Sequence, residues 1–229
     1  MKYISKNIVI IVILGIILFA GSCRKQYQAT EEHMADYGWL LFENSSSLSD
    51  YKNSKTWFLS SVNEDTTYMD GYNGLGWVYG KLTDLDSSIF YYSQALKFSP
   101  GLYDTTNIRR EIWAGLIFAN NAKGLDSTAI VWGDSLFPDW NRTNPGISPW
   151  LFSHNIISSN NIINHLDVLV TLAAANYAIG EFDNSLAQIQ EILSQLKSTT
   201  ILSLDLNTIA GRTELAFQIQ SLQEELSKK

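Results

Sequence analysis

The residues that could carry out chemistry are few, and their spacing matches no catalytic or metal-binding pattern. The three histidines, His33, His154 and His165, form no HExxH motif and no pair four residues apart that would hold zinc on one helical face. No serine lies in a GxSxG turn, and no glycine-rich loop carries the Lys-Ser/Thr of a nucleotide-binding site. The sequence therefore predicts a protein that is not an enzyme and holds neither a metal nor another cofactor.

Close pairs of aspartates are the remaining candidates for acid–base work. Asp84 with Asp86, and Asp134 with Asp139, lie near predicted helix starts or turns. Carboxylates at helix starts accept hydrogen bonds from free backbone N–H groups and interact favourably with the helix dipole. We therefore interpret both pairs as caps. The glycines of 74–80 (GLGWVYG) fall inside a predicted helix, so we interpret them as packing residues and not as a phosphate-binding loop.

Cys23 is the only cysteine in the chain, and the residues before it have a recognisable order. Lys2 and Lys6 form a basic start, and residues 8–20 (IVIIVILGIILFA) are apolar throughout. A basic start, a short apolar core and a small-residue cleavage site describe a secretory signal, whereas a membrane span needs about 20 apolar residues. We expect residues 1–22 to be a signal peptide.

The tetrapeptide Ala20-Gly21-Ser22-Cys23 resembles the bacterial lipobox. That resemblance implies that the Cys23 thiol carries a diacylglyceryl group and that cleavage leaves Cys23 as the first residue, with 23–30 as a tether. The alternative is an ordinary signal peptide or an uncleaved anchor, with Cys23 incidental. Arg24 is not the aspartate that favours inner-membrane retention in enterobacteria, so the outer membrane is the preferred location of this lipoprotein.

The net charge of the chain limits the classes of partner that it is expected to bind. The whole sequence has a net charge of −7, and removal of Lys2 and Lys6 with the signal peptide leaves 14 basic against 23 acidic residues, a net of −9. An acidic chain without a basic run repels phosphate backbones. Nucleic acid is therefore not an expected partner, and the expected membrane attachment is through the lipid.

Residues 31–229 have the pattern of one all-α domain. Apolar residues recur at spacings of three and four through most of the segment, and no apolar–polar alternation is long enough to build a sheet. Helices must therefore position any binding residues of this chain.

Residues 72–100 (YNGLGWVYGKLTDLDSSIFYYSQALKFSP) carry the clearest motif of the chain. Small residues at two positions would let two helices cross closely, and larger residues would fill the gaps beside the crossing. Pro100 would end the second helix. The pattern resembles the tetratricopeptide repeat, a 34-residue helix–turn–helix unit. It is carried by Tyr72, Leu75, Gly76, Tyr79, Ser88 (where the family has alanine), Tyr92, Ala95 and Pro100.

The resemblance extends over most of the domain. The best copies are expected at 69–102 and 166–197; in the second copy Leu172-Ala173 stand at the leucine–glycine pair, Gly180 is the turn glycine, and Ser185 again replaces alanine. Degenerate copies are expected at 34–65 and 107–138, and a loop insertion at 141–160. An amphipathic helix at 205–228 would cover the last apolar face of the stack.

The family implies a short right-handed superhelix with a concave groove lined by the first helix of each repeat, which grips peptides or partner proteins. Trp77, Trp113 and Tyr177 are the candidate groove residues, since Trp and Tyr dominate binding hot spots; the alternative is that they are core residues. The expected function is a membrane-anchored scaffold for an envelope protein or peptide. The alternatives are a glycan- or nutrient-binding surface lipoprotein and an accessory component of outer-membrane protein assembly.

Overall fold

The computed structural model describes residues 29–98, 107–138, 150–152, 154, 163–197 and 202–228. Over these residues the chain is all-α, as expected, and the one pairing of β type is an isolated antiparallel bridge between Leu151 and Asn164. The helices of the described part are α2 Glu31–Glu43, α3 Leu48–Glu64, α4 Met69–Lys81, α5 Leu85–Lys97, α6 Ile108–Ala122, α7 Asp126–Leu136, α8 His165–Ala178, α9 Phe182–Lys197 and α10 Ile209–Leu226.

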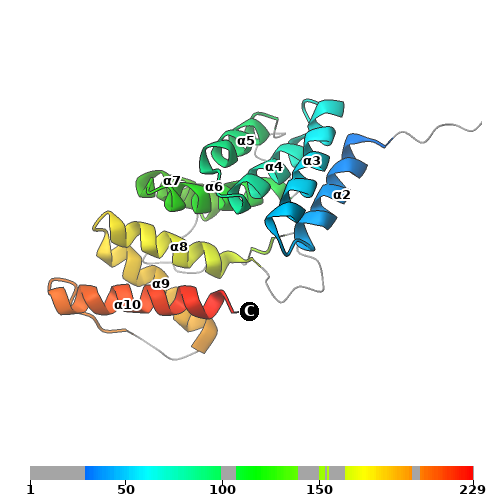
Figure 1. Cartoon of the computed structure of the whole chain (residues 1–229). Helices are drawn as coiled ribbons and strands as arrows, with labels where there is room; N and C mark the ends of the chain where they lie inside the picture. Colours follow the sequence, from blue (N-terminus) through cyan, green and yellow to red (C-terminus); the bar gives the residue numbers. More distant parts are fainter. Residues whose placement is uncertain are drawn as a thin grey trace, which may run out of the picture.

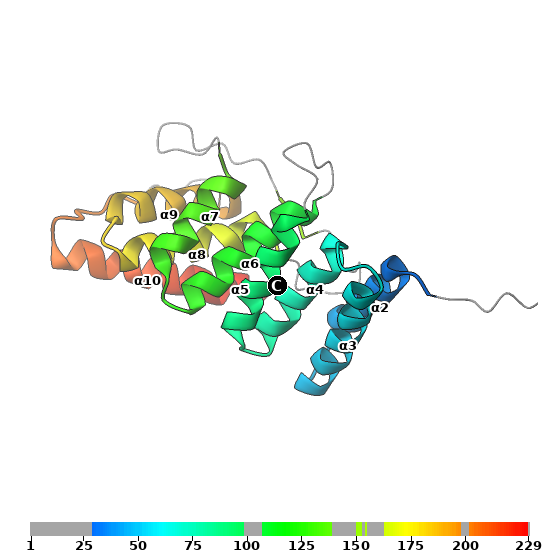
Figure 2. The same cartoon turned by 90° about the horizontal axis from the view of Figure 1, so that it is seen from above.

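Neighbouring helices pack in pairs, which confirms the helical-repeat fold. α2 pairs with α3, α4 with α5, α6 with α7 and α8 with α9, and the second helix of each of the first three pairs also packs on the helix that follows it. The first helices contact one another as well, α2 with α4, α4 with α6 and α6 with α8. Figure 1 shows the pairs stacked in chain order from α2 to α10, and Figure 2 shows the same stack from above.

The turns inside three of the pairs share one backbone geometry. Thr83, Gly124 and Gly180 each lie two residues before the second helix, with φ of 62°, 76° and 88°. In the first turn the Asp84 N–H donates to the Tyr79 carbonyl over 3.0 Å, and the same bond recurs in the other two. The left-handed region suits glycine and strains other residues, so Thr83 is the strained member of the set.

Helix pairs cross closely where glycine was expected. A Cβ on Gly76 would lie 2.4 Å from the Tyr92 ring, and a Cβ on Gly115 would lie 2.2 Å from it. Tyr92, in α5, is 1% exposed and therefore fills the space that these glycines leave in α4 and α6. Leu75 and Ala95 are fully buried beside the crossing, whereas Tyr79 is only half-buried.

α10 packs against α8 and α9 and covers the end of the stack, as a capping helix does. Leu215, Ile219, Leu222 and Leu226 are buried along one stripe. Ile209, the first residue of the helix, is 84% exposed.

Several expectations concern residues that lie outside the described part of the chain. These are the signal peptide 1–22, Cys23 and nearly all of the tether, Pro100, and most of the insertion 141–160. None of the described helices is both long enough and apolar enough to cross a bilayer.

Candidate functional site

A buried ionic cluster joins the segment that precedes α8 to the first helices of the stack. His154 Nδ1 lies 2.7 Å from Glu111 Oε2, and its Nε2 lies 3.4 Å from Asp70 Oδ2. Asp70 belongs to the first turn of α4 and Glu111 to the first turn of α6. Both acidic side chains are buried, and a protonated imidazole places one positive charge between them.

The rest of the cluster is held by neutral donors. Trp39 Nε1–H donates to Asp70 Oδ2 over 2.9 Å, and Asn73 Nδ2 donates to both Asp70 (3.2 Å) and Glu111 (3.0 Å). The Trp39 ring also stacks on His154, with centroids 3.9 Å apart and planes 15° apart. The quadrupole of an aromatic ring attracts a cation that lies over its face. Trp39 therefore stabilises both members of the ion pair, His154 through its ring and Asp70 through its N–H.

The cluster keeps His154 charged at neutral pH. Burial alone lowers the pKa of His154, but the hydrogen bonds and charges of Asp70 and Glu111 outweigh it and raise the pKa to about 10. Burial raises the pKa of the nearby Glu43 carboxyl to about 7, while His154 acts in the opposite direction and Glu111 adds to the rise. The arrangement is therefore a buried ion pair that holds a proton on His154.

The segment Trp150–Phe152 lies in extended form against the same helices. Phe152 N–H donates to the Ile163 carbonyl (3.1 Å), and the Trp150 carbonyl accepts from His165 N–H (3.0 Å). The Phe152 ring lies 4.7 Å from Trp77 and 5.7 Å from Trp39, centroid to centroid. Phe152 contacts two tryptophans, and His154 contacts two carboxylates that Asn73 joins. We call the surface made of these residues the first-helix face; it consists of Trp39, Asp70, Asn73, Trp77 and Glu111.

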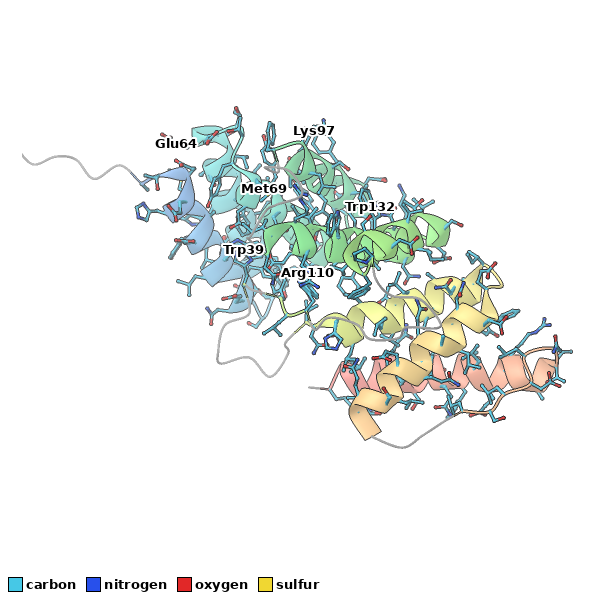
Figure 3. The ribbon with its side chains drawn as sticks, turned by 180° about the vertical axis from the view of Figure 1, so that it is seen from behind. Trp39, Glu64, Met69, Lys97, Arg110 and Trp132 are labelled. Carbon is cyan, nitrogen blue, oxygen red and sulfur yellow. The ribbon has the colours of Figure 1, made fainter. Side chains whose placement is uncertain are left out.

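Figure 3 shows this side of the molecule with Trp39 labelled in α2 and Arg110 in α6. The two labelled side chains lie near the start of α8 in this view. Phe152 and His154, which precede α8 in the chain, both contact Trp39. The first helices thus receive a non-helical stretch of polypeptide from elsewhere in the chain.

A cavity of about 340 Å³ lies between α4, α5, α6 and the start of α8. Its volume is in the range of small-ligand pockets, roughly 300–1,000 Å³. The lining is mostly apolar or small. The residues are Trp77, Gly80, Lys81, Leu85, Ser88, Tyr92, Gly115, Phe118, Ala119, Ala122, Ile163 and Asp167.

The structure places the three candidate aromatic residues differently. Trp77 lines the cavity on one side and contacts Phe152, and it is only 6% exposed. Trp113 is half-buried on α6, and the Arg109 guanidinium carbon lies over its ring, 5.9 Å from the ring centroid. Tyr177 is half-buried near the end of α8, in edge contact with Phe182. Trp113 and Tyr177 therefore share no site with Trp77.

The aspartates considered for acid–base work are not brought together. Asp84 caps α5 by accepting from Ser87 N–H, and this bond and that of the Ser87 hydroxyl lower its pKa. Asp86 pairs with Lys123 across the turn of the next hairpin. Asp134 lies two residues before the end of α7 and caps nothing, and Asp139 is outside the described residues.

Sequence reasoning missed the ionic cluster because its members are distant in the chain. His33 lies in the first turn of α2 against its capping Thr30, and His165 pairs with Gln195; the histidine that matters, His154, is in the expected insertion. The one available signal was Asp70 and Glu111, acidic residues at helical positions that face inward. Among the described residues, no group of three or more His, Cys, Asp or Glu is arranged to hold a metal.

Comparison with models of known protein families finds no match, and no characterised protein matches the sequence either.

Proposed function

We propose that the protein is a non-enzymatic scaffold that binds an envelope protein or peptide through the cavity that adjoins its first-helix face. The lipid on Cys23 would tie the scaffold to a membrane of the bacterial envelope, by preference the outer membrane. The helical-repeat fold is compatible with this role, and the tetratricopeptide resemblance of 72–100 is its basis in the sequence.

One observation carries the proposal. The first-helix face already holds an extended polypeptide segment, since Phe152 packs between Trp39 and Trp77 while His154 pairs with buried carboxylates. Recognition of extended peptides by other proteins uses the same means, apolar anchors in pockets and a few directed polar contacts. The cavity adjoins this face at Trp77, the residue that belongs to both, so a partner side chain would enter there.

The test is affinity capture from detergent-solubilised envelopes, with the full-length lipidated protein as bait. Gly80→Leu fills the cavity, and it should be tolerated because a Cβ at Gly80 meets only Ser88 Oγ at 3.5 Å, an ordinary contact. Lys52→Met on the exposed side of α3 is the matched control.

A partner should be retained by the wild type and by Lys52→Met, and reduced about tenfold or more by Gly80→Leu at an unchanged melting temperature. Equal capture by all three baits would count against the cavity as the partner's site. A tryptophan-fluorescence shift with oligosaccharides and not with peptides would replace this proposal by the nutrient-binding alternative.

A further inference from the structure

Trp77, which lines the cavity, carries a buried hydrogen-bond donor for which the described residues supply no acceptor. Trp77 is 6% exposed, and its indole Nε1–H has no partner in the structure. Buried donors in native proteins nearly always have an acceptor, so an isolated one calls for an explanation. Trp77 lines the cavity, and a bound molecule is one place from which an acceptor would come.

Lys81 supplies a positive charge on the same side of α4 as Trp77. Lys81 follows Trp77 by four residues on α4 and lines the same cavity, as residues at this spacing share a helical face. Its side chain is exposed over part of its length, and no ion pair or hydrogen bond joins its ammonium to a described residue. Burial lowers the pKa of Lys81, because it desolvates the ammonium.

The other charged residue of the lining is already engaged. Asp167 Oδ2 accepts from the Asn164 N–H over 2.8 Å in the capping box that starts α8. The Ser88 hydroxyl donates to the Gly76 carbonyl. Lys81 is therefore the charged lining residue for which the described residues supply no partner, and most of the remaining wall is apolar or small.

We propose that this cavity binds a carboxylate carried on an apolar body, with the carboxylate at Lys81 and the apolar part against Trp77, Tyr92 and Phe118. The inference rests on the proposed function in treating the cavity as a binding site. A neutral apolar molecule would leave Lys81 and the indole N–H unmatched, and an amine would be repelled by the ammonium. The carboxylate can belong to a free organic acid or to the C-terminal residue of a peptide.

The experiment measures binding to the full-length protein by calorimetry, with 3-phenylpropionate and octanoate as acids. The matched probes are 3-phenylpropanol and 3-phenylpropylamine, which keep the apolar body and replace the charge. For ligands of this size we expect dissociation constants of about 10 µM to 1 mM for the acids. The alcohol should bind about tenfold more weakly, because it lacks the charge-assisted bond, and the amine should not bind.

Three variants assign the contacts. Lys81→Met keeps the apolar stem and should weaken the acids about tenfold while leaving the alcohol within about twofold. Gly80→Leu should abolish binding of both, and Lys52→Met should change neither. Equal affinity of acid and alcohol for wild type and Lys81→Met would overturn the carboxylate assignment, and absence of saturable acid binding would overturn the site.

A final comparison identifies the source of the carboxylate. Two short peptides with the same C-terminal phenylalanine are compared, one ending in a carboxylate and the other in an amide. Tighter binding of the free-acid peptide indicates a peptide terminus, and binding of 3-phenylpropionate alone indicates a small acid; either supports the assignment. Partner capture that survives while all acids fail would contradict this inference and leave the scaffold proposal standing.

Discussion

The Ser88 hydroxyl donates to the carbonyl oxygen of Gly76, twelve residues earlier, over 2.8 Å, and both residues are buried. Ser185 makes the same bond, at the same separation and distance, to Ala173 in the α8–α9 pair. The tetratricopeptide pattern has alanine at both serine positions. In this chain the hydroxyl therefore joins the two helices of a pair at their closest approach.

Replacing Ser88 or Ser185 by alanine should lower the free energy of unfolding by about 0.5–1.5 kcal/mol, the usual contribution of such a bond. Urea denaturation measures it. Ser127→Ala, at an exposed position of α7, is the control and should change stability by less than about 0.5 kcal/mol. A gain of stability at both buried sites would mean that the family's alanine packs better than the bonded serine.

Two glycines of α4 should respond oppositely to the same change. A Cβ at Gly76 would lie 2.4 Å from the Tyr92 ring, so Gly76→Ala should cost about 1–3 kcal/mol, and Gly76→Leu more. At Gly80 the nearest atom is 3.5 Å away, and Gly80→Ala should stabilise the helix by up to about 1 kcal/mol. Thermal melts decide between them. Lys81→Ala, at an exposed residue, should stay within about 0.5 kcal/mol.

The strained turn residue offers a stabilising change. Thr83 has φ of 62°, where the matching turns have Gly124 and Gly180. We expect Thr83→Gly to raise stability by about 0.5–1 kcal/mol, since relief of the left-handed strain exceeds the added entropy of the unfolded chain. The reciprocal change Gly180→Thr should be destabilising by a similar amount or more. A loss of stability in Thr83→Gly would show that the threonine side chain contributes more than its backbone strain costs.

Stability should fall as the pH rises above neutrality. The pKa of His154 is about 10 in the fold against an ordinary 6.5, so its contribution is complete below about pH 6.5 and is lost as pH rises through 10. Glu43 acts in the same direction over a lower range, since its pKa rises from 4.5 to about 7 and its contribution is lost on deprotonation. Urea denaturation at pH 6 and pH 9 should show the decline.

His154→Gln is the variant that isolates this effect. It should lower stability at pH 6 by about 3–5 kcal/mol, because two buried carboxylates lose their cation, and it should flatten the decline between pH 6 and pH 9. If wild type and variant lose stability in parallel over that range, another group is responsible.

The proposed lipid attachment depends on one sulfur atom, that of Cys23, and can be tested by replacing this residue. Cys23→Ala should abolish metabolic labelling by a fatty-acid analogue and leave the protein either soluble or held by its uncut signal. The sequence contains no other thiol, so labelling that persists would contradict the assignment.

Local sequence was sufficient to predict the repeats. Gly76 and Ala95 fit a close crossing, Gly180 fits a left-handed turn, and each of these requirements acts within one hairpin. The expected copy 69–102 contains α4 and α5, and the copy 166–197 begins one residue into α8 and ends with α9.

The site was harder to predict because it depends on distant residues. His154 lies in a stretch with no helical period, and nothing near it in sequence indicates that Asp70 and Glu111 will surround it. Trp77 was predicted as a groove residue and lines the cavity, but its 6% exposure depends on Phe152, which arrives from the insertion. Trp113 and Tyr177 were chosen by residue type alone, which does not specify a face.

The stacking of His154 on Trp39 also affects how cooperatively the protein unfolds. In a linear stack each hairpin touches only its neighbours, so an end hairpin can fray alone. Here His154, which follows the third hairpin, contacts Trp39 in the first. Unfolding of α2 would therefore remove the Trp39 ring from the buried ion pair of His154 and Glu111. The amino-terminal end, next to the proposed membrane tether, is thereby coupled to the middle of the stack. Amide hydrogens of α2 should then exchange with solvent through the same cooperative opening as those of α6, and the stack unfolds more nearly as one unit.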